Sequence, residues 1–264
     1  MNNLKEARVR SGAGWKQPSQ GELSRVVTAL VATLALACSA ARAESVSQET
    51  PGDAAALLEQ VRNHRETLSP NFGGFRSDLV VHEDGRRHAG TMLFRPPITL
   101  EVDFEDADLR KRVKRTVRSL LSHRMRTDRS RDAAGEKVAF AGEDSHPLGR
   151  RVVLGDKYSS SYRIRGLNIL EVDRRLDDYR LVITVMETQD TGKGTSLPAH
   201  FFVTTFDQES GAVRQASVYT DTYREMGGEY LPSSRRIVST ADGRTETLLI
   251  EWEGMELLYA AAAE

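Results

Sequence analysis

Two histidines flank a predicted hairpin turn and could share a metal ion if they faced each other. His82 and His88 lie on either side of Asp84-Gly85, a typical two-residue turn sequence. Such a turn pairs His82 with Arg87 and His88 with Val81, which puts the imidazoles on opposite faces of the hairpin. A three-residue loop would instead bring them together, and imidazoles are good ligands of zinc, copper and nickel. We favour the two-residue turn and therefore predict no metal site.

The other side chains that could do chemistry show no catalytic arrangement. After residue 43 the sequence contains no nucleophile elbow, phosphate-binding loop, zinc-binding helix motif or dinucleotide fingerprint. The acidic pair Asp177-Asp178 lies between two strand-like runs, where a solvated turn is the simpler interpretation. We therefore name no catalytic residue and no cofactor. A hydrolase-type enzyme stays open as an alternative, with a histidine and a carboxylate from distant parts of the chain meeting in one cleft.

A strongly basic segment is the most unusual feature. Residues 108–131 hold ten Lys or Arg against two Asp. Apolar residues at helical spacing predict an amphipathic helix here: Leu109, Val113, Val117, Leu120 and Leu121. Six cations occupy the remaining positions and form the basic patch: Arg110, Lys111, Arg112, Lys114, Arg115 and Arg118. The patch could dock on an anionic membrane surface or an acidic protein partner. The simpler interpretation, which we favour, is that its charges offset acidic strands of the same molecule.

The only markedly apolar run, residues 26–37, has the setting of a secretory signal peptide. Basic residues precede it: Lys5, Arg8, Arg10, Lys16 and Arg25. Small residues follow it at Ala41-Arg42-Ala43, where a leader peptidase needs them. The run is too short to cross a bilayer comfortably as a permanent helix. We therefore predict a signal peptide over residues 1–43, cleavage before Glu44, and export to the periplasm or the extracellular space.

Cleavage at this site would also remove the only cysteine, Cys38. The exported chain would then have no disulfide and no cysteine zinc site. The alternative is a lipoprotein in which Cys38 is acylated, but Leu36 occupies a position where a lipoprotein signal needs a small residue. Loss of the leader, which carries a net charge of +4, takes the chain from −1 to −5. An acidic chain disfavours general nucleic-acid binding.

After a polar tether over residues 44–52, residues 53–260 have the pattern of a single β-rich domain. Asp53 can cap a first amphipathic helix, which carries Ala54, Leu57, Leu58 and Val61 on one face. Strand-like runs follow at residues 75–94, 137–141, 150–154, 161–164, 169–174, 179–188, 200–206, 212–223, 235–240 and 245–252. Short turns between consecutive strands favour an antiparallel meander. We predict an α+β fold, mainly antiparallel β, built as a curved meander sheet or half-barrel with the first helix and the basic helix.

Several short motifs resemble one family. They are residues 71–75 (NFGGF), 123–124 (HR), 155–158 (GDKY), 162–174 and 223–232 (YREMGGEYLP). In this order they resemble a domain of unknown function, number 3386, found in cyanobacteria, plastids and planctomycete-type bacteria. The resemblance covers roughly residues 54–258. It implies no agreed activity, so it transfers no catalytic residues to this chain.

The order of elements also bears a looser, fold-level resemblance to the periplasmic lipoprotein carriers, whose curved antiparallel half-barrel wraps around helices. From this order we expect a non-enzymatic exported domain that binds an apolar or lipid-like ligand on the concave side of its sheet. Aromatic residues of the strands would line the pocket in part and fill the core in part: Phe94, Phe104, Phe140, Phe201, Phe202, Phe206, Tyr219, Trp252 and Tyr259.

Overall fold

The structure is a computed structural model that describes residues 51–97, 99–125, 137–142 and 145–259. The expected signal peptide, its cleavage site and Cys38 lie outside the described residues, as does most of the expected tether. The first described helix, α2 (Pro51–His64), begins two residues before the predicted start at Asp53. Proline is well suited to the first turn of a helix because it has no amide hydrogen to leave unpaired there.

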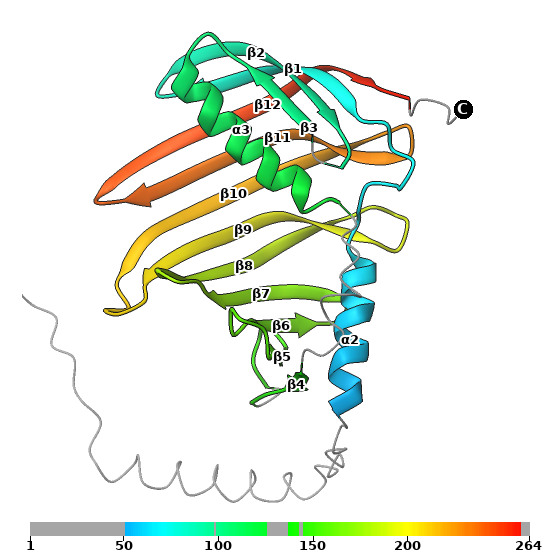
Figure 1. Cartoon of the computed structure of the whole chain (residues 1–264), viewed down its shortest axis with the longest axis vertical. Coiled ribbons are helices and arrows are strands. Elements are labelled where there is room, and N and C mark those ends of the chain that lie inside the picture. Colours follow the sequence, from blue (N-terminus) through cyan, green and yellow to red (C-terminus); the bar gives the residue numbers. More distant parts are fainter. Residues whose placement is uncertain (1–50, 98, 126–136, 143–144, 260–264) are drawn as a thin grey trace, which may run out of the picture. The chain divides into compact units, whose positions relative to one another are not determined.

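In the described part of the chain, twelve strands form one antiparallel sheet, in the order β3-β2-β1-β12-β11-β10-β9-β8-β7-β6-β5-β4 (Figure 1). The strands are β1 (Phe75–Glu83), β2 (Arg86–Arg95), β3 (Thr99–Asp103), β4 (Val138–Phe140), β5 (Arg150–Leu154), β6 (Ser161–Arg165), β7 (Asn168–Arg175), β8 (Tyr179–Asp190), β9 (Ser196–Asp207), β10 (Val213–Met226), β11 (Glu229–Ala241) and β12 (Arg244–Leu257). Strands β4 to β12 follow one another as a meander, and β1 pairs with β12. The predicted curved antiparallel meander is therefore confirmed.

Tight turns set the register of the hairpins. Asp84 and Gly85 both have positive φ values, 49° and 74°, as do Asp242 and Gly243, at 51° and 72°. Two-residue turns with both φ values positive match the twist of an antiparallel pair. The first turn therefore has two residues, and His82 pairs with Arg87 as predicted.

One core lies between the sheet and the second helix, α3 (Ala107–Ser122). The five predicted stripe residues of α3 are all buried. They pack with Phe75, Leu79, Phe94, Ile250 and Trp252, among others, from β1, β2 and β12. Asp106 caps the start of the helix, and its side chain accepts hydrogen bonds from the amides of Asp108 and Leu109 at 2.8 and 3.0 Å. It ends at Ser122, so the expected helix over residues 108–131 was too long, and residues 126–136 lie outside the described part of the chain.

A second, smaller core lies under α2. Ala54, Leu58 and Val61 of this helix pack with residues of β5 and β6: Val152, Leu154, Tyr162 and Ile164. The cross-strand register places these strand residues on the same face of the sheet as the core under α3. We call this the inner face and its opposite the outer face. Among the described residues, no helix is long and apolar enough to cross a membrane.

Candidate functional site

Between the two cores, the inner face of the central strands carries apolar side chains that neither helix covers fully. We call them the inner-face strip: Leu181, Ile183, Val185, Phe201, Val203, Tyr219 and Ile237. None of the seven belongs to either core cluster of the described residues. Five remain partly exposed, and Val185 and Ile237 are each 8% exposed. An apolar surface of this kind is a natural place for an apolar ligand.

Charged and hydroxyl groups are buried at one end of the strip. We call this the closed end. There Asp221 of β10 faces Arg235 of β11, and both side chains are almost fully buried. The guanidinium donates from Nε to Oδ1 at 2.7 Å and from Nη2 to Oδ2 at 2.6 Å. Two parallel hydrogen bonds of this kind fix both side chains and satisfy a charge that would be costly to bury alone. The guanidinium carbon also lies 5.2 Å from the centre of the Tyr219 ring.

Two tyrosines extend this arrangement along β10. Tyr219 stacks on Phe201, with ring centres 4.9 Å apart and planes 4° apart. Tyr223 donates to Oδ2 of Asp221 at 3.2 Å and lies 3.4 Å from the carbonyl oxygen of Pro198. Burial raises the pKa of the Tyr223 phenol, and the negative charge of Asp221 raises it further. The phenol therefore stays neutral and keeps its role as a donor.

Arg124, just beyond the end of α3, lies against Tyr223 at this same end. Its guanidinium carbon is 5.5 Å from the ring centre of Tyr223, and the residue is 3% exposed. Nε donates to the carbonyl oxygen of Glu66 at 3.2 Å, whereas Nη1 and Nη2 have no hydrogen-bond partner among the described residues. Burial lowers the pKa of Arg124, although Tyr223 and two nearby carboxylates oppose this effect.

The segment that connects α2 to β1 closes this end of the strip. The amide of Glu66 donates to the carbonyl oxygen of Ser196 at 3.0 Å. The amide of Leu68 donates to the carbonyl oxygen of Arg124 at 2.8 Å. The carboxylate of Glu66 accepts a hydrogen bond from the hydroxyl of Thr195. The carboxylate of Glu229 accepts from the amide of Ser69 at 3.2 Å. Both carboxylates are therefore engaged by groups other than Arg124.

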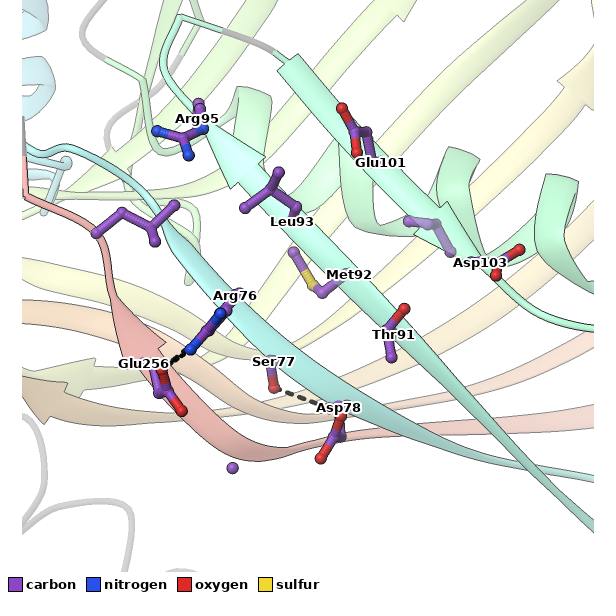
Figure 2. A pocket seen from close by; sticks show the side chains of 13 residues that line it. Arg76, Ser77, Asp78, Thr91, Met92, Leu93, Arg95, Glu101, Asp103 and Glu256 are labelled. Atoms are coloured by element: carbon purple, nitrogen blue, oxygen red, sulfur yellow. Dashed lines mark hydrogen bonds and ion pairs between the residues drawn. The ribbon is translucent and has the colours of Figure 1, made fainter.

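A hollow lies on the outer face, over β1, β2, β3 and β12. This trough has a volume of about 670 Å³. Figure 2 shows Arg76 directed at Glu256, while Asp78, Glu101 and Asp103 contribute carboxylates from β1 and β3. Six of its thirteen lining residues are charged, and an apolar ligand bound there would have to cover these groups.

His82 and His88 do not face each other across the first hairpin. The register pairs His82 with Arg87 and His88 with Val81, so that the two imidazoles lie on opposite faces. Within the described residues, no group of three or more potential metal ligands comes together. His82 instead lies 3.3 Å from the carboxylate of Glu251, and both side chains are more than 40% exposed. This pair is the kind that a hydrolase needs, but it lies on an open strand surface and does not line the trough on the outer face.

Only half of the basic patch forms ion pairs with described residues. Arg110, Lys111 and Arg112 pair with Asp103, Asp108 and Glu83 at 3.4, 3.3 and 2.6 Å. Lys114, Arg115 and Arg118 form no ion pair with a described residue. Part of the positive charge is therefore offset by nearby carboxylates, while in the second half of α3 Arg115 and Arg118 are exposed and Lys114 is partly exposed.

The residues at the closed end of the strip were not predicted from the sequence. Asp221 and Arg235 are 14 positions apart, and nothing in their local sequences distinguishes them from exposed strand residues. Arg124 belongs to the basic segment and to the motif at residues 123–124, but the sequence assigned it no role. Tyr223 lies in the motif at residues 223–232, and Tyr219 and Phe201 belong to the aromatic residues expected to line a pocket in part.

The sequence model of a family described as protein of unknown function (DUF3386) matches residues 49–258. No relative was found among the curated proteins. Among solved structures, a domain from Vibrio parahaemolyticus described as an outer membrane lipoprotein-sorting protein is 7% identical over 81% of this chain and 95% of its own, with a TM-score of 0.29. A DUF1329 family protein from Desulfovibrio piger is 11% identical over 81% and 93%, with a TM-score of 0.26.

The complex of MucA and MucB from Pseudomonas aeruginosa is also similar, at 11% identity over 79% of this chain and all of the matched one, with a TM-score of 0.19. One of these solved structures, the lipoprotein-sorting domain, is of the kind that the order of elements resembles loosely. With TM-scores below 0.5, they carry no property over to this chain.

Proposed function

This chain belongs to the family of proteins of unknown function DUF3386, and we propose that it is an exported protein that binds an apolar or lipid-like ligand on the inner face of its sheet. The inner-face strip is the observation that carries this proposal. It places partly exposed aromatic and aliphatic side chains side by side on four neighbouring strands, between two finished cores. Surfaces of this composition gain free energy by excluding water, at roughly 25 cal/mol per Å² of apolar area.

The proposed compartment rests on the leader-like segment of residues 1–43. Basic residues, an apolar run and small residues follow one another there in the order that export requires. An apolar or lipid-like ligand suits such a protein because these molecules need a carrier or a binding surface outside the membrane. Sequencing the amino terminus of the secreted protein tests this part. A start at Glu44 is expected, whereas a start at an acylated Cys38 would mean that the protein is tethered to a membrane.

A matched pair of substitutions tests the ligand surface. Val203 of β9 lies on the inner face opposite Ile183, whereas Val182 of β8 lies on the outer face opposite Thr204. Both valines are partly exposed. We expect Val203→Gln to weaken binding of an environment-sensitive apolar dye and of a long-chain alcohol by roughly tenfold, since a polar group then interrupts the strip.

Val182→Gln is the control, because it makes the same chemical change on the other face of the same pair of strands. Its affinity for the dye and the alcohol should equal that of the unchanged protein. Equal losses in the two variants, or no binding by the unchanged protein, would contradict the proposal. Circular dichroism of both variants establishes that the sheet is intact.

A second candidate function is docking of α3 on an anionic membrane surface, and the three cations that pair with no described residue favour it. Each Lys or Arg near an anionic surface contributes about 1 kcal/mol. Reversal of Lys114, Arg115 and Arg118 to Glu should abolish salt-sensitive binding to vesicles that contain phosphatidylglycerol. The control reverses the exposed cations Arg175, Arg236 and Arg244. Equal binding by the two triple variants would exclude a specific role for α3.

A further inference from the structure

The strongest unassigned feature is the buried guanidinium of Arg124. Both Nη atoms are shielded from solvent and lack a hydrogen-bond partner among the described residues. Buried polar groups in folded proteins are nearly always hydrogen-bonded, and a charged group without partners is among the most costly to bury. An arginine used only for packing would be replaced at less cost by a methionine or leucine. These two buried donors therefore need a hydrogen-bond acceptor.

The other charged groups at the closed end do not supply that acceptor. The carboxylate of Asp221 is fully used by Arg235 and Tyr223. The carboxylate of Glu66 is held by Thr195, and that of Glu229 by the amide of Ser69. These carboxylates keep the region close to neutral overall without bonding to the Nη atoms of Arg124.

Arg124 also lies next to the end of the strip, where it could meet the head group of a ligand. Its guanidinium lies against the ring of Tyr223, which belongs to the same strand as Tyr219 of the strip. A molecule whose chain lay on the strip would meet Arg124 at the buried polar end. The two Nη donors of one guanidinium match the paired oxygens of a carboxylate or phosphate.

We propose that the ligand is a single-chain amphipathic anion, with its chain on the inner-face strip and its carboxylate or phosphate head group bound by Nη1 and Nη2 of Arg124. This inference rests on the proposed function and adds the chemical class of the head group. Because the two nitrogens are covered, head-group binding requires the side chains around them to move, and the partly exposed Tyr223 is the one that borders the strip. Arg235 is not the anchor, since Asp221 already satisfies it.

The test measures how the purified protein binds four ligands at concentrations below micelle formation: dodecanoate, dodecyl phosphate, dodecanol and acetate. We expect the two long-chain anions to bind roughly tenfold to a hundredfold more tightly than dodecanol, as a charge-assisted hydrogen-bond pair predicts. Whichever anion binds more tightly identifies the head group. Acetate should not bind measurably, because it has no chain to bury. Saturable binding of acetate would overturn the proposal in favour of a small-anion site.

Two substitutions of Arg124 complete the test. Arg124→Met should reduce the affinity for both long-chain anions to that for dodecanol, and leave dodecanol binding unchanged. Arg124→Lys should keep part of the preference for anions, because it keeps the charge. Arg244→Gln, an exposed cation at the start of β12, controls for net charge. It should bind all four ligands as the unchanged protein does.

The outcomes separate this inference from the proposed function. Equal binding of anions and dodecanol by the unchanged protein would overturn the role of Arg124 while the apolar surface stands. Failure of every long-chain ligand to bind would overturn both. If Arg124→Met does not fold, the preference of the unchanged protein for anions and the behaviour of Arg124→Lys still decide the question. Loss of anion preference in Arg244→Gln would also count against Arg124.

Discussion

At the scale of single residues, the Asp221–Arg235 pair makes the clearest prediction about stability. Asp221→Asn keeps the shape of the side chain but leaves the Arg235 charge buried without its counter-ion. Breaking a buried ion pair from one side typically costs about 3 to 5 kcal/mol. We expect the free energy of unfolding, measured in urea, to fall by an amount of this order. The double variant Asp221→Leu, Arg235→Met should lose less than the single one, because no charge is left unpaired. A single variant as stable as the unchanged protein would show that this pair is not buried in solution.

Tyr223 makes a prediction about pH. Its pKa is raised in the folded state by burial first and by the Asp221 charge second. A group with a raised folded pKa contributes stability that is complete below its unfolded pKa, about 10, and is lost as the pH rises toward the folded value. We therefore expect stability to fall above pH 10, and a spectrophotometric titration to show a tyrosine that ionises only as the protein unfolds. Tyr223→Phe should reduce this late step by one tyrosine, because burial also raises the pKa of Tyr219. An unchanged titration would argue against burial of this phenol.

At the scale of secondary-structure elements, local rules predicted the turns and helix faces well. The five apolar positions of α3 and the Asp84-Gly85 turn are where the sequence placed them. The elements that were missed or shortened are a short strand and two strands that contain a proline. β3 is only five residues long and was not recognised, and β9 and β11 extend through Pro198 and Pro232, at which a sequence-based reading ends a strand. The inner-face strip and Arg124 come together only once β8 to β11 are in register, which no single segment reveals.

The packing of β2 against β3 makes a prediction at this scale. A Cβ atom added at Gly90 would meet the carbonyl oxygen of Asp103 and come within 2.6 Å of the Phe104 ring. Gly90→Ala should therefore force β3 away from β2 and lower stability by about 1 to 3 kcal/mol, as overpacking usually does. Gly155→Ala is the matched control, because its nearest contacts would be at an ordinary 3.5 Å. Thermal unfolding of the two variants checks this. Equal melting temperatures would contradict the close approach at Gly90.

At the scale of the whole molecule, one sheet joins two separate cores. β12 pairs with both β1 and β11, so that the first and last strands of the described sheet tie the α3 core to the meander. The α2 core is smaller and involves β4, β5 and β6, close to a sheet edge where β4 has three residues. The central strands between the cores have fewer fully buried apolar contacts on their inner face. Regions with few such contacts open at a lower free energy than core strands.

This arrangement predicts where a ligand would stabilise the protein. In hydrogen exchange, the amides of β1, β11 and β12 should exchange most slowly, and those of β4 and β5 fastest. A ligand on the inner-face strip binds the folded state only, so it should raise the melting temperature in proportion to the logarithm of its concentration above the dissociation constant. Added protection should then appear first in β8, β9 and β10, since these strands carry most of the strip. Protection confined to β2 and β3 would instead place the ligand in the outer trough and contradict binding on the inner face.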